Sequence, residues 1–538
     1  MLDARLTGRF VTFDDACPET DALGVLGGRI VALGDDARSL PARREHDLGA
    51  ATCFPGFHDA HAHTVGFGLA LGELDLSTPP VRSLDDLYAA VAERAAATPL
   101  EGVVVGRGYD QNKLGAHPDR HALDAASGGR AVWLTHTSGH MCVVNTAALD
   151  RIGAAIDAEP DGGRVVRDAR GVPTGLLEER AQVLAQALCL PRSVTAIARA
   201  IADAHAVYLR EGLTSVCDAG VAGGWIGQSP AELAGYQLAR DEGGLAVRTT
   251  VMLADDVLSS MARHRDDQTQ RGVDAGIRTG LGDEWLRVGA LKVFADGSLI
   301  GRTCWMHDGF TDDPGNHGYP QRDPDELRAL IVDAHLAGWQ VATHAIGDEA
   351  VSFVLDAYEA ALAASPRRDH RHRLEHCGVT TEASLERIAR LGVIPVPQGR
   401  FVGELGDGMR AALGARTADT YRLASFLRAG VVLPGSSDRP VVDGRPLLGI
   451  ADMVARRTES GAPFSPHEAL TCDEALRCYT VGSAFATRSE RERGTLEVGK
   501  CCDVVALDRD PRTCADPAEI ADVDVVATFV GGEPRFAR

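Results

Sequence analysis

Short apolar segments alternate with helix-like segments over most of the chain, from residue 54 to residue 435. Residues 324–337, 349–364 and 382–391 carry apolar side chains at helical spacing. Alternation of strand and helix is typical of a parallel sheet, and eight repeats favour a (β/α)8 TIM-like barrel. The predicted strands are residues 54–60, 213–217, 247–253, 286–294, 339–344, 372–376, 393–396 and 431–435. We therefore expect an α/β fold whose barrel occupies residues 54–489.

Two parts of the chain lie outside this repeat. About 150 residues separate the first predicted strand from the second, so we expect a large insertion at about residues 75–205. An insertion there would stand above the carboxyl face of the barrel, where it could form a wall of the pocket. Residues 1–53 and 490–538 are both rich in strand-like segments. We expect the two ends to meet in one small β-sandwich domain.

The composition excludes several classes of protein. The chain has 55 basic and 76 acidic residues and a formal net charge of −21, which argues against nucleic acid or an anionic membrane as partner. No stretch approaches the roughly 18 apolar residues of a membrane span, and the first residues lack the apolar core of a signal peptide. The 12 cysteines show no CxxC spacing. We expect a cytoplasmic protein with reduced thiols.

The first predicted strand is followed by two histidines, His61 and His63, separated by one residue. On an extended segment, residues i and i+2 point to the same side, so both imidazoles can bind one metal ion. Two loop histidines with ordinary hydrogen bonds would be the alternative. The position just after a buried strand, which itself follows a β-rich segment, favours metal binding.

Lys292 lies inside the apolar strand 286–294 of a chain that has three lysines among its 55 basic residues. Arginine serves almost everywhere else, so a lysine at this place indicates a specific need. Burial lowers the pKa of a lysine, whereas a guanidinium stays charged. A neutral amine can take up carbon dioxide and become a carbamate, an anionic ligand with two oxygens that can bridge two cations. The alternative is a lysine whose ammonium group reaches solvent from the strand end.

Three further side chains of metal-ligand type stand at the ends of predicted strands, namely His344, His376 and Asp438. Alone, each histidine would be interpreted as a core residue and Asp438 as a helix N-cap. Strand ends on the carboxyl face are where barrel enzymes place their chemistry. Together with the histidine pair and the strand lysine, the set offers six ligands, too many for one tetrahedral ion. It suits two divalent ions, for which we expect zinc, with open positions for water.

A set of short motifs runs through the chain: Gly106-Arg107-Gly108-Tyr109-Asp110, Gly139-His140 with Asn145 and Ala148-Leu149, Asp296-Gly297-Ser298, His344-Ala345-Ile346-Gly347-Asp348, Glu375-His376, Ser437-Asp438 and Gly494-Thr495-Leu496-Glu497-Val498-Gly499-Lys500. On these motifs the chain resembles the amidohydrolase superfamily over nearly its whole length, specifically the branch that contains N-substituted formamide deformylase (amidohydrolase family 3). Two positions depart from the pattern. Tyr109 stands where tryptophan is common, and Cys501-Cys502 replaces small residues.

The resemblance implies a barrel with a β-sandwich formed by both termini, and it favours a homodimer. It also implies how the ligands are divided between two ions. One metal ion would be held by His61, His63 and Asp438 and the other by His344 and His376, with carboxylated Lys292 bridging them.

We expect a metal-activated hydroxide to attack the carbonyl carbon of a small-molecule substrate. Asp438 would take up the proton and pass it to the leaving nitrogen, first as general base and then as general acid. Asp59, Glu375 and Asp348 are candidates for holding the ligating histidines in place. His140, from the insertion, is the candidate for binding the substrate or its oxyanion, and a structural role is the equal alternative.

The function expected from these residues is hydrolysis of a carbon–nitrogen bond in a small amide or N-substituted formamide. The same ligands would serve a lactam, a carbamate, an ester or the deamination of a heterocycle, so the sequence leaves these alternatives open. A non-catalytic scaffold on the same fold is a third possibility, which the complete ligand set disfavours. Further candidates for contact with the substrate are Tyr109, Arg302, Gln398 and Arg439.

Overall fold

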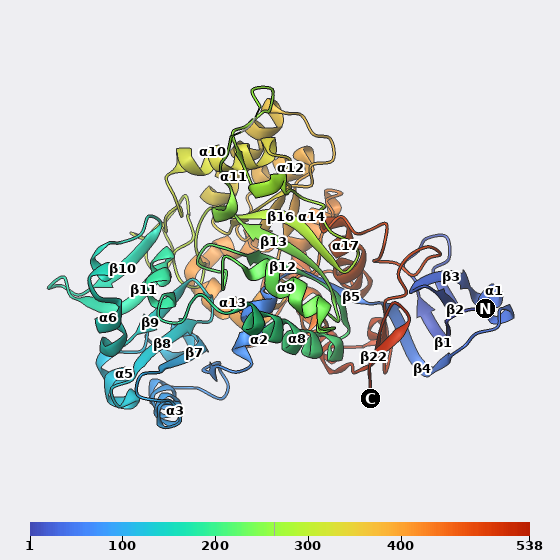
Figure 1. Cartoon of the computed structure of the whole chain (residues 1–538), viewed down its shortest axis with the longest axis horizontal. Coiled ribbons are helices and arrows are strands. Elements are labelled where there is room, and N and C mark those ends of the chain that lie inside the picture. The colour runs from blue at the N-terminus through green and yellow to red at the C-terminus, as the bar shows by residue number, and fades with distance from the viewer. Residues whose placement is uncertain (263) are drawn as a thin grey trace.

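The computed structural model of the chain describes residues 1–262 and 264–538. Its centre is one sheet of parallel strands, which Figure 1 shows between two flanking β-rich regions. The sheet curls into a nearly closed barrel, and its strands are almost entirely buried, as expected where helices cover the outside. In order across the sheet the strands are β19 (Ile394–Val396), β18 (Arg373–His376), β17 (Val341–Ala345), β16 (Leu286–Phe294), β13 (Arg248–Ala254), β12 (Leu213–Val221) and β5 (Phe57–Ala62).

The eighth strand predicted at residues 431–435 is wrong, because this segment has no strand assignment. It nevertheless lies beside β5, where the Ala60 N–H donates to the Gly435 carbonyl at 3.0 Å and the Asp438 N–H donates to the His61 carbonyl at 2.7 Å. Pro434 has no N–H to offer a ladder, and the Gly435 N–H donates to Cys478 instead. The segment therefore occupies the open edge of the barrel without completing it.

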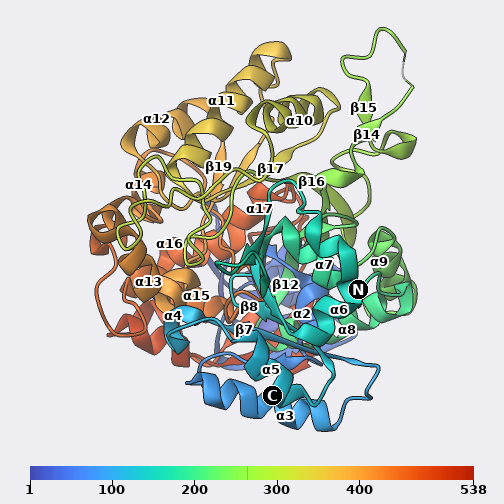
Figure 2. The ribbon, with the colours of Figure 1, turned by 90° about the vertical axis from the view of Figure 1, so that its left-hand side faces the viewer.

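Helices on the outside of the barrel connect its strands. The structure confirms the three helices named from the sequence as α10 (Pro324–Leu336), α11 (Asp348–Ala364) and α12 (Glu382–Leu391). Side-chain caps explain where two of them begin: Asp323 accepts hydrogen bonds from the first turn of α10, and Thr381 accepts one from the first turn of α12. Figure 2 shows this group at the top of the barrel, with α8 (Val194–Arg210) and α9 (Glu232–Asp241) at its side.

A second sheet stands between β5 and β12 in the chain, within the region predicted as an insertion. Figure 1 shows it to the left of the barrel, packed with α3 (Leu84–Ala96), α5 (Arg120–Ser127) and α6 (Thr146–Ile152). Its strands, in order, are β10 (Gly163–Arg167), β11 (Pro173–Glu179), β9 (Met141–Val144), β8 (Ala131–His136), β7 (Val103–Tyr109) and β6 (Leu74–Asp75). The bounds of the insertion stay a prediction.

Both termini contribute to a third sheet, at the right of Figure 1. β20, from the carboxyl-terminal part, pairs antiparallel with β4 from the amino-terminal part. The order is β22 (Glu533–Ala537), β21 (Val525–Val530), β20 (Val504–Leu507), β4 (Glu45–Pro55), β1 (Ala4–Val11), β2 (Glu19–Leu26) and β3 (Arg29–Leu33). The two ends thus meet in one sheet, while the description of this region as a sandwich stays a prediction.

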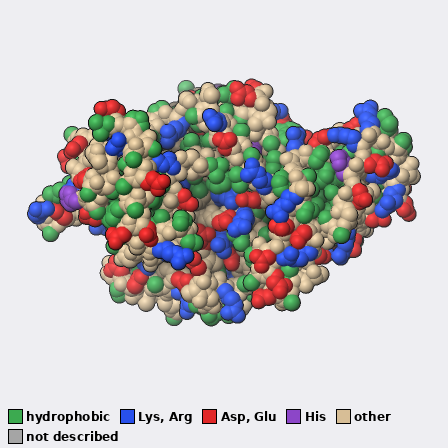
Figure 3. All heavy atoms as spheres, turned by 90° about the horizontal axis from the view of Figure 1, so that it is seen from below, with side chains coloured by type: hydrophobic (Ala, Val, Ile, Leu, Met, Phe, Trp, Pro, Cys, Tyr) green, Lys and Arg blue, Asp and Glu red, His purple; other side chains and the backbone are tan. Residues whose placement is uncertain are grey.

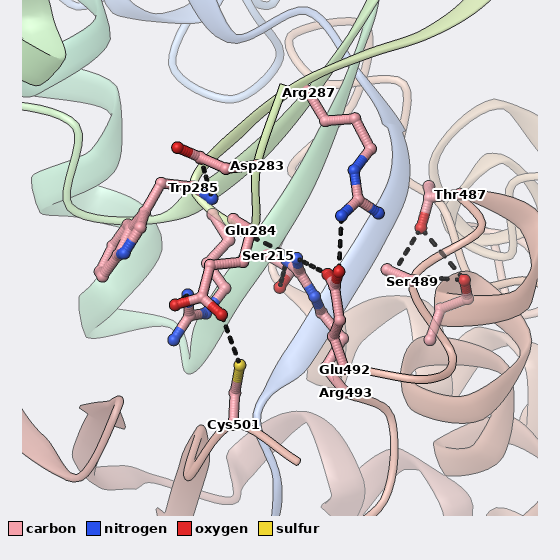
Figure 4. Close-up of polar contacts among 12 residues, drawn as sticks. Ser215, Asp283, Glu284, Trp285, Arg287, Thr487, Ser489, Glu492, Arg493 and Cys501 are labelled. Carbon is pink, nitrogen blue, oxygen red and sulfur yellow. Dashed lines mark hydrogen bonds and ion pairs between the residues drawn. The ribbon is translucent and has the colours of Figure 1, made fainter. Parts of the chain in front are cut away.

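A buried ion pair and a hydrogen bond join this terminal sheet to the barrel. Arg248, the first residue of β13, donates from Nε to Oδ2 of Asp503 at 2.8 Å, and its Nη1 lies 3.2 Å from a carboxylate oxygen of Glu284. Figure 4 shows the neighbouring contacts, in which Arg493 donates to the hydroxyl of Ser215 in β12. The Arg248–Asp503 ion pair and the Arg493–Ser215 hydrogen bond each join a barrel strand to a residue that precedes β20, so they hold the two units together.

The surface agrees with an ordinary globular protein. Acidic and basic side chains are interspersed on the face seen in Figure 3. Among the described helices, none combines the length and the apolar character needed to cross a membrane.

Candidate metal centre

The carboxyl end of the barrel gathers four histidines around one lysine and one aspartate. Because the strands are parallel, their carboxyl ends meet at one rim. All of the six side chains except that of His63 are buried. They are His61 in β5, His63 just after it, Lys292 in β16, His344 in β17, His376 at the end of β18, and Asp438 after the segment beside β5.

His61, His63 and Asp438 form one subgroup, whose ligand atoms lie within 4.8 Å of one another. Asp438 Oδ1 is 3.3 Å from His61 Nε2 and 3.0 Å from His63 Nε2. Despite these short distances, no hydrogen-bond donor of the described residues is aligned with that buried oxygen. Two imidazole nitrogens and a carboxylate oxygen around one point are a donor set that suits a divalent cation.

His344 and His376 form a second subgroup, with ring centroids 4.4 Å apart. Nε2 of His344 lies 3.0 Å from the Gly297 carbonyl, and its Nδ1 is buried without a partner among the described residues. Burial lowers the pKa of both imidazoles, to about 3 for His376, so both rings are neutral at neutral pH. A neutral imidazole with one nitrogen anchored and the other free is the form that binds metal.

Lys292 stands between the two subgroups. Its Nζ lies 3.5 Å from Nε2 of His61 and 4.7 Å from the ring centroid of Phe294. Burial lowers the pKa of the amine to about 8, although the carboxylates of Glu375 and Asp438 act in the opposite direction. No carboxylate oxygen of the described residues lies within 4.0 Å of Nζ. A buried amine without a salt-bridge partner is suited to covalent modification.

Hydrogen bonds hold two of the candidate ligands from behind. Glu375 accepts a short hydrogen bond from Nδ1 of His61, and Arg373 donates to both carboxylate oxygens of Glu375. Oε1 of Gln398 accepts from Nδ1 of His376 at 2.8 Å. Fixing Nδ1 in this way leaves Nε2 of each ring for a metal ion. The free nitrogens and the unpartnered Asp438 oxygen therefore fit bound divalent ions.

The two other acids suggested as supports lie differently. Asp59 accepts the backbone N–H groups of His61 and Ser437, at 3.0 and 3.1 Å, and so joins β5 to the segment that carries Asp438. Asp348, the first residue of α11, accepts a hydrogen bond from the backbone N–H of His307 and does not contact a candidate ligand. Asp59 therefore supports the candidate centre through backbone hydrogen bonds, whereas Asp348 supports the loop that contains His307.

Three residues around the centre have backbone φ angles in the left-handed region: His376 at 67°, Asp438 at 60° and Glu179 at 51°. Residues other than glycine rarely adopt this conformation, which costs about 1–3 kcal/mol each. Such strain gathers at functional sites, where the surrounding structure forces a side chain into a required direction.

The second sheet supplies one further histidine to the rim. His140 follows β8, and its ring centroid is 4.9 Å from that of His344. Nδ1 of His140 lies 2.7 Å from Oε2 of Glu179, the last residue of β11, and Thr303 donates to the other oxygen of Glu179. Nε2 of His140 is thereby left for contact with a substrate.

A cavity of about 960 Å³, counting its open mouth, lies over the centre between the barrel and the second sheet. Its lining includes Lys292, His344 and Asp438 of the candidate centre. Its walls combine apolar rings with amides and arginines. They include Trp133, His140, Gln182, Gln186, Arg107, Arg192, Trp225, Ile226, Gln228 and Phe294.

Two predicted contact residues serve the interior instead of this cavity. Tyr109 is fully buried in the core of the second sheet, with its hydroxyl 3.2 Å from Nδ1 of His117. Gln398 is fully buried behind His376, whose Nδ1 it holds. Neither lines the cavity, because each side chain is directed into packed core.

Two predicted arginines also lie outside the cavity. Arg302 is held by Asp312 and by the carbonyl of Ile300 at 2.8 Å. Arg439 is paired with Glu211, and its guanidinium stacks on the ring of Phe67 at 4.3 Å. Each guanidinium is neutralised by its own carboxylate, so neither is available to the cavity described above.

Sequence reasoning missed Arg192, Trp225 and Phe294, which line the cavity, and Glu179, which is fully buried and holds His140 in the cavity wall. Phe294 ends a predicted strand, so its position next to the rim followed from the strand boundary. The others come from the second sheet and from loops, and no periodicity or motif marked them. Only the packing of distant segments brings them together.

Comparisons with known proteins show which proteins this chain is similar to. The model of the amidohydrolase family matches residues 44–536. The chain is 31% identical to putative amidohydrolase YtcJ of Bacillus subtilis, covering 96% of this chain and 95% of that protein. It is 32% identical to N-substituted formamide deformylase of Arthrobacter pascens, covering 98% and 97%. The crystal structure of an uncharacterized metal-dependent hydrolase from Pyrococcus furiosus superposes with a TM-score of 0.70 at 27% identity, covering 95% of this chain and 100% of that one.

Proposed function

Because the chain belongs to the amidohydrolase family and is a metal-dependent hydrolase that acts on carbon–nitrogen bonds, we propose that it hydrolyses a small amide or an N-substituted formamide. One observation carries the proposal: six ligand-type side chains from distant parts of the chain meet at one rim of the barrel, beneath a cavity. The formamide deformylase that is 32% identical over nearly the whole chain supports the choice of bond.

The residues would hold two divalent ions, for which zinc suits the nitrogen and oxygen donors. His61, His63 and Asp438 would bind one ion, and His344 and His376 the other. Bound divalent ions lower the pKa of water to near neutrality and polarise a carbonyl group.

Lys292 would link the two subgroups as a carbamate. Its neutral Nζ would form a bond to the carbon of carbon dioxide and release one proton, which leaves an anion with two oxygen donors. Burial and the absence of a carboxylate partner within 4.0 Å support this assignment, since an ammonium ion there would stay unpaired among the described residues.

Asp438 and His140 would handle the substrate. Oδ1 of Asp438 would take a proton from the attacking water and return it to the leaving nitrogen. This oxygen is free to do so because it accepts no hydrogen bond from the described residues. Nε2 of His140, with its ring fixed by Glu179, would hydrogen-bond the substrate from the cavity side. Trp225 and Phe294 would exclude water around the scissile bond.

Two measurements test the proposal. Elemental analysis of the purified protein should find about two divalent ions per chain, and fewer than one tightly held ion would refute the proposed centre. A panel of formamides, acetamides, lactams, carbamates, esters and aminoheterocycles should release amine with formate or acetate from the first two groups. Ammonia from the heterocycles, or turnover confined to lactams, carbamates or esters, would keep the centre and reject the proposed bond.

A further inference from the structure

Arg192 lies in the wall of the cavity, between the second sheet and α8, and it lacks a carboxylate partner. Its backbone N–H donates to the Gln228 carbonyl at 2.9 Å, which fixes where its side chain begins. Its Nε is buried without a hydrogen-bond acceptor among the described residues, and none of their carboxylate oxygens lies within 4.0 Å of its guanidinium. A partly buried guanidinium loses part of its hydration, and here no anion of the described residues compensates for that loss.

The other cavity arginine does not share this property. Nε of Arg107 lies 2.6 Å from Oε2 of Glu73, and both side chains line the same cavity. Their charges cancel, so of the two arginines that line this cavity only Arg192 keeps a positive charge without a carboxylate partner among the described residues. The chain as a whole has a formal charge of −21, which makes a local cation without a partner a specific feature and not a general one.

Aromatic rings connect the metal centre to this part of the wall. The Phe294 ring centroid is 5.0 Å from that of His344, and the Trp225 centroid is 4.9 Å from that of Phe294. Nε1 of Trp225 is buried and also lacks an acceptor among the described residues. The rings of Phe294 and Trp225 therefore form an apolar surface that begins next to His344 and ends at Trp225, whose indole N–H has no acceptor among the described residues.

The segment that carries Trp225 is held in place from three sides. Gln186 donates to the Trp225 carbonyl, and Gln228 donates to the Ile226 carbonyl at 3.3 Å. The buried carboxyl group of Glu232, in the first turn of α9, accepts the N–H groups of Ala222 and Gln228 at 2.9 and 3.0 Å. These contacts fix Gln228, whose carbonyl holds the backbone of Arg192, in relation to the aromatic rings.

We propose that Arg192 binds a carboxylate at the far end of the substrate, so that the preferred substrates are amides whose apolar body ends in an anion. The apolar body would lie along Phe294 and Trp225, and the carboxylate oxygens would supply the acceptors that the guanidinium lacks. This inference rests on the proposed function for the nature of the cleaved bond, and on Arg192 alone for the anion.

A set of matched compounds tests the inference. The probes are ω-formamido carboxylates of increasing chain length and the ω-formamido alcohols of the same lengths, assayed with metal-loaded protein by formate release. The best carboxylate should exceed its alcohol in kcat/KM by about 10- to 100-fold, mainly through KM, since a charge-assisted contact is lost in the alcohol. In Arg192→Gln the carboxylate should fall to the level of the alcohol, while the alcohols change little.

Arg199→Gln is the matched control, because it removes one positive charge from an exposed position on α8 where the side chain lies 3.9 Å from Asp203. It should leave the preference intact. Equal kcat/KM for carboxylates and alcohols in the native chain, or an unchanged preference in Arg192→Gln, would overturn the inference.

Equilibrium binding of the same compounds, followed by calorimetry, separates this inference from the proposed function. If no compound releases formate, the proposed bond is wrong for this series. Tighter binding of carboxylates than of alcohols, lost in Arg192→Gln but kept in Arg199→Gln, would still support the anion site. Binding that does not distinguish the two series would reject it.

Discussion

Oε2 of Glu179, the last residue of β11, lies 2.7 Å from Nδ1 of His140, which follows β8 in the same sheet. Thr303 donates to the second oxygen of Glu179, so both carboxylate oxygens are engaged. The carboxylate thus determines the orientation of the histidine that the second sheet places beside the candidate metal centre, with its ring centroid 4.9 Å from that of His344.

Glu179→Gln should therefore impair turnover without removing metal. An amide can accept from only one of its two positions, so either His140 or Thr303 loses its acceptor. We expect kcat to fall by about 10- to 100-fold, as is usual for groups that orient active-site residues, with an unchanged metal content. Glu178→Gln is the control, since the neighbouring side chain on β11 pairs loosely with Arg164 at 3.9 Å. Loss of metal from Glu179→Gln, or an unaltered kcat, would show that Glu179 has another role.

Lys292→Arg should abolish most of the activity, because arginine keeps a positive charge but cannot form a carbamate. We expect kcat/KM to fall by about a hundredfold or more. The chain has three lysines, so Lys113→Arg and Lys500→Arg are natural controls. After incubation with 13C-labelled bicarbonate, a carbamate signal should be present in both controls and absent in Lys292→Arg. Native activity in Lys292→Arg would exclude a bridging carbamate.

The sequence predicted the barrel elements well where local pattern and final position coincide. The helix at residues 382–391 has its predicted bounds because Thr381 and Gly392 mark its two ends locally. The strand 286–294 was equally clear, since its residues are apolar except for Arg287 and Lys292. The prediction of a strand at residues 431–435 was wrong because Pro434 has no N–H to donate to a neighbouring strand. The apolar pattern of the segment does not reveal this.

The residues of the candidate site also fall into a group that the sequence could predict and a group that it could not. The six ligand-type side chains lie at one rim because parallel strand ends must converge, and their role as ligands stays a prediction. The residues around the cavity could not be predicted from the sequence. Arg192 and Trp225 line the cavity, and Glu179 holds His140 in its wall, because distant segments pack together, which leaves no local pattern in the sequence. Arg302 and Arg439 lie outside this cavity, and each is paired with a carboxylate that the sequence does not reveal.

Glu232→Gln should raise stability at alkaline pH relative to the native chain. Burial raises the pKa of Glu232 to about 8 in the folded state, with Asp218 adding to the effect. Below pH 4.5, the ordinary value for this group, folded and unfolded chains both hold the proton. Between that pH and about 8 only the folded chain holds it, so the native protein loses about 1.4 kcal/mol of stability per pH unit.

Glutamine avoids this loss and can keep both backbone hydrogen bonds, because Ala222 and Gln228 donate to the same oxygen of Glu232. The advantage of the variant should grow by roughly 3 kcal/mol or more between about pH 5 and pH 9, measured as urea unfolding midpoints. Glu242→Gln, at an exposed position just after the same helix, should show no such trend. A constant difference between variant and native protein at all pH values would contradict a raised pKa.

Asp503→Asn should destabilise the joint between the terminal sheet and the barrel. The side chains of Arg248 and Asp503 are 2% and 4% exposed, so removing one charge leaves the other buried with incomplete compensation. We expect a loss of about 3–5 kcal/mol, reduced to the extent that Glu284, 3.2 Å from Arg248, takes over the pairing. Arg240→Gln breaks a pair with Asp283 in which both side chains are 45% exposed, and it should cost less than about 1 kcal/mol. The comparison of the two unfolding midpoints decides the point, because similar small losses in both variants would mean that the buried pair does not hold the two units together.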